Sequence, residues 1–457
     1  MKSRTDAKTI DLTLRKNTFE EVQCVFTEAE ALEEASRCLN CPTRPCVGAC
    51  PVNIQIPDFI EAIKEIAYEE AYRIITETNL FPSICGRVCP QEKQCEGSCV
   101  LAKVKQPIAV GNLERFASEY ETELGESNKK TNAKVAIIGS GPAGLACATD
   151  LAKAGVSVTI FEALHDYGGV LRYGIPDFRL PNEVVKQQIK KLELLGCDFK
   201  NNFLVGKTSR LNDLRKQGFH AFFIATGAGF PTFLGVPNEG SIGVFSANEF
   251  LTRVNLMNAY KPEFDTPLYS AKKVVVIGGG NVAMDAARCA LRLGSEVQLL
   301  YRREIEDMPA RNEEIKHAIE EGIEVIERVN PISFIADERK KITGVVLKKM
   351  QLQENANDTR RSFIPIEGSE YEIDTDIVIV AIGTKPNSNF AKSEKEIVLN
   401  DRGCVVVNEN MQTAIPDVFS GGDAINGGAT VIAAMGDGKK AATNILSYLE
   451  KEKILGM

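Results

Sequence analysis

One glycine-rich stretch, residues 135–144, constrains the fold of this chain more than any other. An apolar run typical of a buried strand leads into Gly139-Ser140-Gly141-Pro142-Ala143-Gly144 and then into a helical pattern. In such a unit the first glycine allows a tight turn, the second lets the backbone approach a pyrophosphate, and the third lets the helix pack against the strand. Phosphates then lie at a helix N-terminus, which binds anions. The stretch predicts a Rossmann-like dinucleotide site.

An acidic residue follows the next apolar run. Residues 157–161 are typical of a strand, and Glu162 comes directly after them, where a carboxylate can hydrogen-bond a ribose diol. The alternative is a glycine-rich turn without a ligand, but strand, glycines, helix and acid occur here in the order that a nucleotide site requires. Three later segments offer further cofactor contacts. They are Gly168-Gly169-Val170 in a glycine-rich loop, Asp423 after a strand, and Thr430-Val431 at the start of the last helix.

A second unit of the same kind occurs further along the chain. Residues 274–277 form a strand, Gly278-Gly279-Gly280-Asn281-Val282-Ala283 a turn, and residues 284–293 a helix. Arg302 and Arg303 occur near the position where the first unit has its acid. Guanidinium groups bind a 2'-phosphate through charge-assisted hydrogen bonds, whereas a carboxylate at this position would repel the phosphate. The second site is therefore predicted to bind NADPH. The alternative is that the two arginines form a solvated basic edge.

Eight of the thirteen cysteines are concentrated between positions 38 and 99. They form two groups, Cys38-x2-Cys41-x4-Cys46-x3-Cys50-Pro51 and Cys85-x3-Cys89-Pro90-x4-Cys95-x3-Cys99. The N-terminus has no signal-peptide apolar core, so we expect a cytoplasmic protein whose thiols bind metal rather than form disulfides. Two structural zinc sites would use similar groups of four, but cofactors that carry electrons favour iron–sulfur clusters.

Other patterns set the domain organisation. Apolar residues recur at helical spacing over 56–78, a second helix is expected over 110–120, and the polar residues 121–130 are typical of a linker. Residues 341–350 and 363–373 alternate like two strands of a hairpin. The formal charge of −8 and the absence of a long apolar run argue against nucleic-acid binding and a membrane-embedded role.

These patterns predict an α/β protein in which an α-helical iron–sulfur domain precedes two Rossmann-like domains, the second of which, for NADPH, is inserted in the first. The expected boundaries are 1–130 for the helical domain, 131–248 with 386–457 for the first dinucleotide domain, and 249–385 for the inserted NADPH domain. No side chain is predicted to act as a catalytic nucleophile, acid or base, because hydride and electron transfer use the chemistry of the cofactors themselves.

The order of the cysteine groups, GSGPAG, Glu162, GGVLRYGIP, ATG, GGGNVAMD, YRR, MPAR and SGGDA resembles the small, beta subunit family of NADPH-dependent glutamate synthase. The same module is similar to the larger subunit of NADH-dependent reduced ferredoxin:NADP oxidoreductase and to the N-terminal part of dihydropyrimidine dehydrogenase. The resemblance covers nearly the whole chain. It implies FAD at the first glycine-rich turn, NADPH at the second, and two [4Fe-4S] clusters in the helical domain.

The resemblance also implies particular site residues. One cluster would take Cys38, Cys41, Cys46 and Cys99, and the other Cys50, Cys89, Cys95 and Glu114. For the last of these ligands, spacing alone would choose Cys85 instead. In the nucleotide domains, Arg179, Asp423 and Thr430 would contact FAD, and Arg302, Arg303 and Arg311 would hold the 2'-phosphate.

The function implied by the resemblance is electron transfer between NADPH, FAD and the clusters, as the small subunit of glutamate synthase in L-glutamate biosynthesis. A larger subunit would then carry out the glutamate chemistry, for which this chain has no residues left. Two alternatives stay open. One is the NADPH-binding, bifurcating subunit of a ferredoxin:NADP oxidoreductase with a ferredoxin-linked flavoprotein partner, and the other is an electron-relay module for a pyrimidine reductase.

Overall fold

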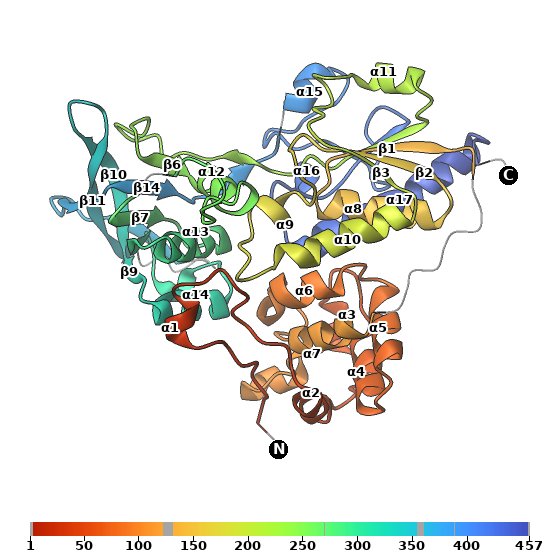
Figure 1. Cartoon of the computed structure of the whole chain (residues 1–457), viewed down its shortest axis with the longest axis horizontal. Helices are drawn as coiled ribbons and strands as arrows, with labels where there is room; N and C mark the ends of the chain where they lie inside the picture. The colour runs from red at the N-terminus through yellow and green to blue at the C-terminus, as the bar shows by residue number, and fades with distance from the viewer. Residues whose placement is uncertain (1–2, 122–130, 269, 354–360, 388, 456–457) are drawn as a thin grey trace.

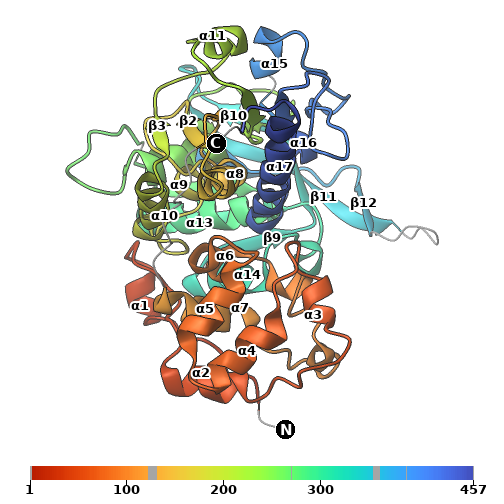
Figure 2. The ribbon, with the colours of Figure 1, turned by 90° about the vertical axis from the view of Figure 1, so that its right-hand side faces the viewer.

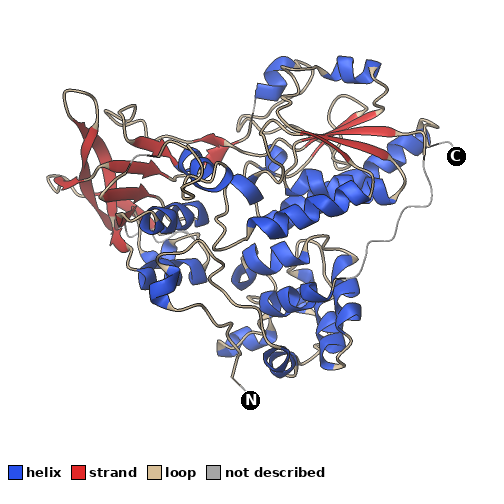
Figure 3. Ribbon diagram, in the orientation of Figure 1, coloured by secondary structure: helices blue, strands red, loops and turns tan. Residues whose placement is uncertain are grey.

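The computed structural model describes residues 3–121, 131–268, 270–353, 361–387 and 389–455. A helical N-terminal domain lies beneath two domains built on parallel sheets, as Figures 1 and 3 show. The predicted α/β class and the order of the domains are confirmed. Among the described helices, none is both long enough and apolar enough to cross a membrane.

Most of the helical domain is built around an apolar core that includes Phe59, Ile63, Leu113 and Phe116, whereas the helix Pro82–Val88 packs in the core of the first nucleotide domain. The helices of the helical domain are α1 (Leu12–Arg15), α2 (Glu28–Ala35), α3 (Pro45–Gly48), α4 (Ile56–Lys64), α5 (Tyr68–Thr76), α6 (Pro82–Val88) and α7 (Val110–Ala117), with short 3-10 turns η1 (Gln91–Lys93), η2 (Val100–Val104) and η3 (Ser118–Tyr120). The linker expected after them lies, apart from Glu121, outside the described residues.

The prediction of a single helix over residues 56–78 is wrong. The segment forms two helices, α4 and α5, separated at Ile66, whose φ is +61° and whose side chain is 60% exposed. A continuous helix of that length would extend about 34 Å and leave this small core. The break lets both halves bury their apolar faces in the same core, which is why the periodicity continues across it.

The first parallel sheet has the strand order β16-β4-β1-β2-β3. Its strands are β1 (Lys134–Ile138), β2 (Ser157–Phe161), β3 (Asp198–Lys200), β4 (Ala221–Ile224) and β16 (Val418–Ser420). The associated helices are α8 (Pro142–Lys153), α9 (Val170–Tyr173), α10 (Asn182–Leu194), α11 (Leu211–Lys216), α15 (Asn389–Ser393), α16 (Asp423–Asn426) and α17 (Val431–Lys451). Helices α8, α10 and α17 cover the face toward the helical domain (Figure 1). Because β16 returns to this sheet, the intervening domain is an insertion.

The inserted domain has the strand order β6-β14-β7-β8-β9. Its parallel strands are β6 (Val244–Ser246), β7 (Lys273–Ile277), β8 (Glu296–Tyr301), β9 (Glu324–Glu327) and β14 (Ile377–Val380), and its helices are α12 (Ala247–Leu251), the π-helix η4 (Thr252–Leu256), α13 (Asn281–Arg292), η5 (Ile305–Asp307) and α14 (Asn312–Glu321). An antiparallel sheet packs beside it, formed by β10 (Val329–Ala336), β11 (Ile342–Gln353), β12 (Ser362–Pro365) and β13 (Tyr371–Asp374).

The structure corrects the first boundary of the insertion. Strand β6 pairs with β14 in the second sheet, so residues 244–248 belong to the inserted domain and not to the first one. The chain crosses between the domains through β5 (Phe230–Pro231) and β15 (Thr384–Lys385), which pair with each other. Sequence patterns missed this because three residues are too few to identify a strand, and the strand that pairs with them lies far along the chain.

The N-terminal segment ties the helical domain, which lies below the nucleotide domains in Figure 2, to the inserted domain, because α1 lies beside α14 (Figure 1). Arg15 of α1 forms an ion pair with Glu320 of α14 at 2.5 Å, and the ring of Phe19 stacks on Tyr260 at 4.0 Å. Val22 donates a backbone hydrogen bond of 3.0 Å to Phe178. The three domains therefore share buried contacts.

Candidate functional site

The first glycine-rich turn is tightly packed on one side and open on the other. Gly139 has a φ of +107°, and a Cβ on it would lie 2.4 Å from the carbonyl oxygen of Ala225. A Cβ on Gly144 would lie 2.0 Å from the carbonyl oxygen of Gly139, whereas one on Gly141 would meet nothing within 4 Å. Pro142 and Ala143 begin α8 directly after this opening. The turn thus leaves space at the helix N-terminus, as a pyrophosphate requires.

Glu162 directly follows β2 and is directed at this turn. Its Oε2 accepts hydrogen bonds from the backbone N of Ser140 at 2.9 Å and from the hydroxyl of Ser140 at 2.6 Å. The same hydroxyl accepts from Gly168 N at 3.0 Å. Sequence reasoning missed Ser140, although its place between the first two glycines was a signal: a hydroxyl there can connect the acid to a second loop.

Two later segments reach the same place. A Cβ on Gly169 would lie 2.8 Å from Gly141 Cα, so the loop that precedes Val170 covers the glycine-rich turn. A Cβ on Gly422 would lie 2.9 Å from Ala143 Cβ, which places Asp423 and the start of α16 against α8. The predicted residues of the first site therefore come together.

The C-terminal part of this site is built by hydrogen bonds. Asp423 Oδ1 accepts from Ala429 N at 2.8 Å, and burial raises the pKa of the Asp423 carboxyl. Thr430 caps α17 by accepting from Ala433 N at 3.3 Å, and Val431 is the first residue of that helix. The N-terminus of α17 therefore has a fixed position next to the first sheet.

The second glycine-rich turn repeats the plan of the first. A Cβ on Gly278, whose φ is +144°, would lie 2.3 Å from the carbonyl oxygen of Ala381, and one on Gly280 would meet nothing within 4 Å. Helix α13 follows, with Asn281 at its first position, Val282 39% exposed and Ala283 fully buried. Asn281 Oδ1 accepts from Arg311 N at 2.9 Å. The second turn is also open at a helix N-terminus.

The three arginines expected at a 2'-phosphate have different surroundings. Arg302 is exposed and Arg303 half-buried after β8, and within the described part of the chain neither side chain forms a hydrogen bond or ion pair. Arg311 instead donates from Nη1 to the carbonyl oxygen of Arg87 at 2.7 Å and from Nη2 to Glu313 at 2.9 Å. Its guanidinium is thus committed to the junction with the helical domain, which leaves Arg302 and Arg303 available for a ligand.

Arg179 joins the two nucleotide domains. Its Nη1 donates to both carboxylate oxygens of Asp285 in α13, at 2.8 and 2.6 Å, and its Nε lies 3.0 Å from Glu314 Oε1, outside hydrogen-bond geometry. Burial raises the pKa of Asp285 to about 6, although the positive charge of Arg179 opposes that rise. The side chain expected to contact FAD is therefore paired across the domain junction.

Four cysteines surround a cavity near the surface of the helical domain, and we call this group the outer site: Cys38, Cys41, Cys46 and Cys99. Leu39, Ile60 and Leu101 are among the apolar residues that complete the wall. All four thiols are partly exposed, and partial burial raises the pKa of Cys46 to about 11. Thiols in such a wall become thiolates when they bind a cationic centre, so the donors fit an iron–sulfur cluster.

A second group is buried between α6, α7 and the adjacent loops, and we call it the inner site: Cys50, Cys85, Cys89, Cys95 and Glu114. None of the five is more than 8% exposed. Helices α6 and α7 are in close backbone contact here, since a Cβ on Gly86 would lie 2.9 Å from both Gly111 O and Arg115 N, and burial raises the pKa of the Cys50 and Cys95 thiols. Burial raises the pKa of Glu114 to about 8, and the amide of Asn79, which donates to Glu114, opposes that rise.

A buried acid among thiols fits a cationic iron–sulfur group, because such a group would compensate the carboxylate and thiolate charges. Taken over the described ranges, no three His, Cys, Asp or Glu side chains are placed to hold a single metal ion. The thiols of the outer site are arranged around a cavity instead.

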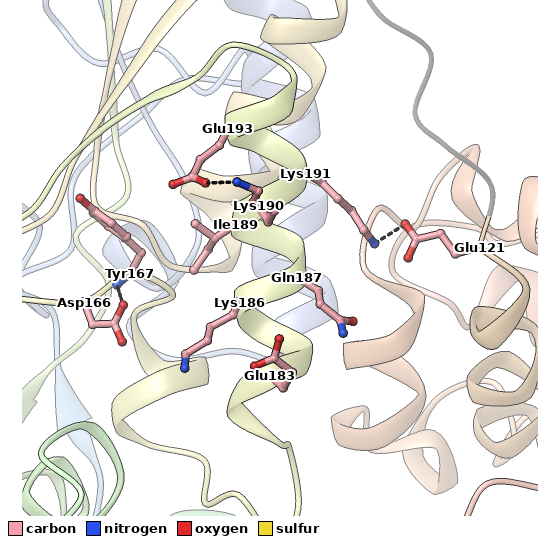
Figure 4. Close-up of a pocket in the computed structure, with 10 residues that line it drawn as sticks. All are labelled: Glu121, Asp166, Tyr167, Glu183, Lys186, Gln187, Ile189, Lys190, Lys191 and Glu193. Carbon is pink, nitrogen blue, oxygen red and sulfur yellow. Dashed lines mark hydrogen bonds and ion pairs between the residues drawn. The ribbon is translucent and has the colours of Figure 1, made fainter.

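Another hollow lies elsewhere, on the outer side of α10 (Figure 4). Asp166 and Tyr167 line it together with residues of α10 from Glu183 to Glu193, and Lys190 and Glu193 of that helix form an ion pair at 3.7 Å. None of the predicted cofactor residues lines it, so we assign the chemistry to the two glycine-rich turns and the two cysteine sites.

Comparison with known proteins identifies both parts of the chain. Residues 133–438 match the pyridine nucleotide-disulphide oxidoreductase family, and residues 15–126 match dihydropyrimidine dehydrogenase domain II, described as a 4Fe-4S cluster domain. Both cysteine sites lie within the second match. In solved structures, the Mycobacterium tuberculosis protein FprA in complex with NADPH has a TM-score of 0.58 at 20% identity, covering 71% of this chain and 86% of FprA, which shows a shared fold.

Curated relatives extend the comparison to nearly the whole chain. The glutamate synthase [NADPH] small chain of Escherichia coli is 35% identical over 98% of this chain and 97% of its own length. The beta subunit of NADP(+)-dependent formate dehydrogenase from Moorella thermoacetica is 37% identical over 90% of this chain, but only 60% of that protein is covered. The beta subunit of NADPH-Fe(3+) oxidoreductase from Geobacter sulfurreducens is also 37% identical, with 64% of its length covered.

Proposed function

This chain belongs to the family of NADPH-dependent glutamate synthase small chains, and from that premise we propose that it passes electrons from NADPH through FAD and two [4Fe-4S] clusters to a larger partner subunit. The family makes it a flavin and iron–sulfur oxidoreductase that transfers electrons. The rest of the proposal rests on one observation: the same chain contains two open glycine-rich turns and two groups of cysteines.

The first turn holds FAD in this proposal. Gly139, Gly141 and Gly144 keep the backbone close to the pyrophosphate, and Glu162 accepts hydrogen bonds from the ribose. The remaining contacts come from Pro142, Ala143, Gly168, Gly169, Val170, Asp423, Thr430 and Val431. When bound, a flavin can take two electrons as hydride and release them singly. The protein supplies the orientation and excludes water.

The second turn holds NADPH through Gly278, Gly280, Asn281, Val282 and Ala283. Arg302 and Arg303 donate to the 2'-phosphate, since both guanidinium groups are unpaired within the described residues. Arg179 and Arg311 act at a distance from the ligand: they hold the inserted domain against the FAD domain and the helical domain.

The two cysteine sites hold the clusters. Cys38, Cys41, Cys46 and Cys99 bind the outer cluster, and Cys50, Cys89, Cys95 and Glu114 bind the inner one. The inner site borders the FAD domain, because Cys85 and Cys89 pack in the same core as Ala143 and Met435. A Cβ on Gly436 of α17 would also lie 3.1 Å from Val52. The electron path therefore runs from FAD to the inner and then the outer site.

The partner binds near the outer site, because its thiols are partly exposed whereas those of the inner site are buried. We propose a glutamate synthase large subunit as that partner, on the strength of the relatives that match over nearly their whole length. A second candidate is an acceptor subunit of a different enzyme, since relatives named as formate dehydrogenase and NADPH-Fe(3+) oxidoreductase subunits are equally similar.

Anaerobic stopped-flow reduction of the purified chain by NADPH and by NADH tests the proposal, with iron and acid-labile sulfide assayed on the same sample. We expect rapid flavin bleaching by NADPH alone and about eight irons per chain. Zinc in place of iron, or no bleaching by either nucleotide, would contradict it. Adding a purified glutamate synthase large subunit with glutamine and 2-oxoglutarate tests the partner: glutamate formation supports the first candidate, and its absence favours the second.

A further inference from the structure

Acidic residues follow directly after the two arginines of the second site. Arg302 and Arg303 are followed by three acids within the next four residues, so the acids of this loop outnumber the arginines. Glu306 is exposed to solvent, whereas Glu304 and Asp307 are half-buried. A carboxylate beside a bound 2'-phosphate repels it, and a carboxylate beside a free guanidinium pairs with it. The loop can therefore bind a phosphate only if its own carboxylates are held elsewhere.

Two arginines from later parts of the chain bind these carboxylates. Arg361, which directly precedes β12, donates from Nε and Nη2 to the two carboxylate oxygens of Asp307, at 3.0 and 2.8 Å. Its Nη1 donates to Glu304 Oε2, and Arg328 Nη2 donates to Glu304 Oε1. The Glu304 and Asp307 side chains are only 15% and 14% exposed. All four carboxylate oxygens thus have a guanidinium donor.

The backbone of the same loop is fixed beside the two arginines. Arg328 N donates to Arg303 O at 3.0 Å, and Glu327 accepts a hydrogen bond from Ile305 N. Arg328 has a φ of +55°, a left-handed conformation that is uncommon in residues other than glycine. Arg328 therefore holds the loop through both its backbone and its guanidinium group, and it keeps Glu304 turned toward itself and Arg361.

We propose that Arg361 is a positioning residue that makes the second site selective for NADPH over NADH. It holds Glu304 and Asp307 so that neither carboxylate pairs with the arginines expected at the 2'-phosphate or repels the phosphate itself. Arg328 assists by binding the other oxygen of Glu304. Removing Arg361 should weaken the binding of a nucleotide that has a 2'-phosphate and spare one that lacks it. The inference rests on the proposed function, because it requires NADPH at this site.

The test compares the full-length wild-type chain, purified with its flavin, with three variants: Arg361→Met, a triple variant that adds Glu304→Gln and Asp307→Asn, and Arg339→Met. Since the Arg361 side chain is 40% exposed, its replacement should not disturb the core. Arg339 is the matched control, because it is an exposed arginine in the turn between β10 and β11 of the same domain. Calorimetric titration with NADP+ and with NAD+ measures each Kd without turnover, and flavin content reports folding.

For Arg361→Met we expect the Kd for NADP+ to rise about tenfold, equivalent to the loss of one charge-assisted hydrogen bond, and the Kd for NAD+ to change less than about twofold. The triple variant should bind NADP+ within about threefold of the wild type, because neutral amides neither repel the phosphate nor form ion pairs with arginine. Arg339→Met should match the wild type with both nucleotides.

An equal loss of NADP+ and NAD+ binding in Arg361→Met would overturn the proposal, because it would show a structural role alone, and so would unchanged binding of both. A selective loss that the triple variant does not recover would also overturn it, since Arg361 would then act on the phosphate and not on the two carboxylates. If Arg361→Met loses its flavin, the same comparison is made with Arg361→Gln. A wild-type chain that binds NADP+ no better than NAD+ would instead contradict the proposed function itself.

Discussion

The two nucleotide domains share a backbone plan and differ in the charge that follows their second strand. In both, a Cβ on the first glycine would collide with a carbonyl oxygen of a neighbouring strand end, and one on the second glycine would meet nothing. Glu162 follows the second strand of the first unit and hydrogen-bonds the turn, whereas Arg302 and Arg303 follow β8, the second strand of the second unit. The comparison teaches that the backbone plan is common to both turns, so we expect the side chains after the second strand to select the nucleotide.

Gly144→Val should have the largest effect, by removing the first site while leaving the second. The new side chain cannot fit where a Cβ already lies 2.0 Å from Gly139 O. We expect flavin content below about a tenth of the wild-type value, because α8 can no longer pack against β1. Flavin absorbance of the purified protein measures it. Gly240→Ala is the control, since its Cβ would meet nothing within 4 Å; equal flavin loss there would contradict the explanation.

Arg179→Met should weaken the junction that the two domains share. The variant leaves the buried carboxylates of Asp285 and Glu314 without this partner, and breaking a buried ion pair costs about 3–5 kcal/mol. Urea unfolding followed by circular dichroism checks the loss. Adding Asp285→Asn to the Arg179→Met variant should recover part of the lost stability, because the substitution removes the unpaired buried charge of Asp285. No recovery would mean that packing, and not charge, explains the effect.

Replacing Arg302 and Arg303 by glutamine should remove the selectivity of the second site. Two charge-assisted hydrogen bonds are together worth about 3 kcal/mol, so kcat/KM for NADPH should fall about 100-fold while that for NADH changes little. Stopped-flow flavin reduction with each nucleotide separates the two. Arg339→Gln, an exposed arginine outside the site, serves as the control. An equal loss with both nucleotides would show that the pair does not read the 2'-phosphate.

Glu162→Gln should have the smallest effect of the four. The amide keeps the shape of the side chain but removes the charge that accepts from Ser140 N and from the Ser140 hydroxyl. A charge-assisted hydrogen bond is worth about 1.5 kcal/mol more than none, so we expect FAD to bind about tenfold more weakly. Titration of the apoprotein with FAD measures the Kd. An unchanged Kd would mean that Glu162 orders the loop without contributing to the ribose contact.

The cysteine sites show where sequence reasoning reached its limit. Spacing chose Cys85 as the last ligand of the second group, while the resemblance chose Glu114, and the structure buries both side chains on the adjacent helices α6 and α7. Spacing along the chain predicts which thiols lie on one loop. It does not predict that α7, which follows both cysteine groups and carries Glu114, packs against α6.

The glycine turns and the order of the domains followed from the sequence alone. A tight strand-to-helix turn needs glycine at set positions whatever the surroundings, so the requirement is local and visible in a few consecutive residues. Strands β1 and β7, the start of α8, and helix α13 consequently lie close to where the patterns predicted them.

Only the tertiary structure decided the features that depend on residues far apart in the chain. It placed β6 in the second sheet, divided residues 56–78 into two helices, and paired Arg179 with Asp285 and Arg311 with the backbone of Arg87. A guanidinium group satisfies its hydrogen bonds with whichever acceptors the fold brings near it, and burial makes that pairing necessary. The sequence shows where such an arginine lies in the chain, but the packing of the three domains determines which acceptor it binds.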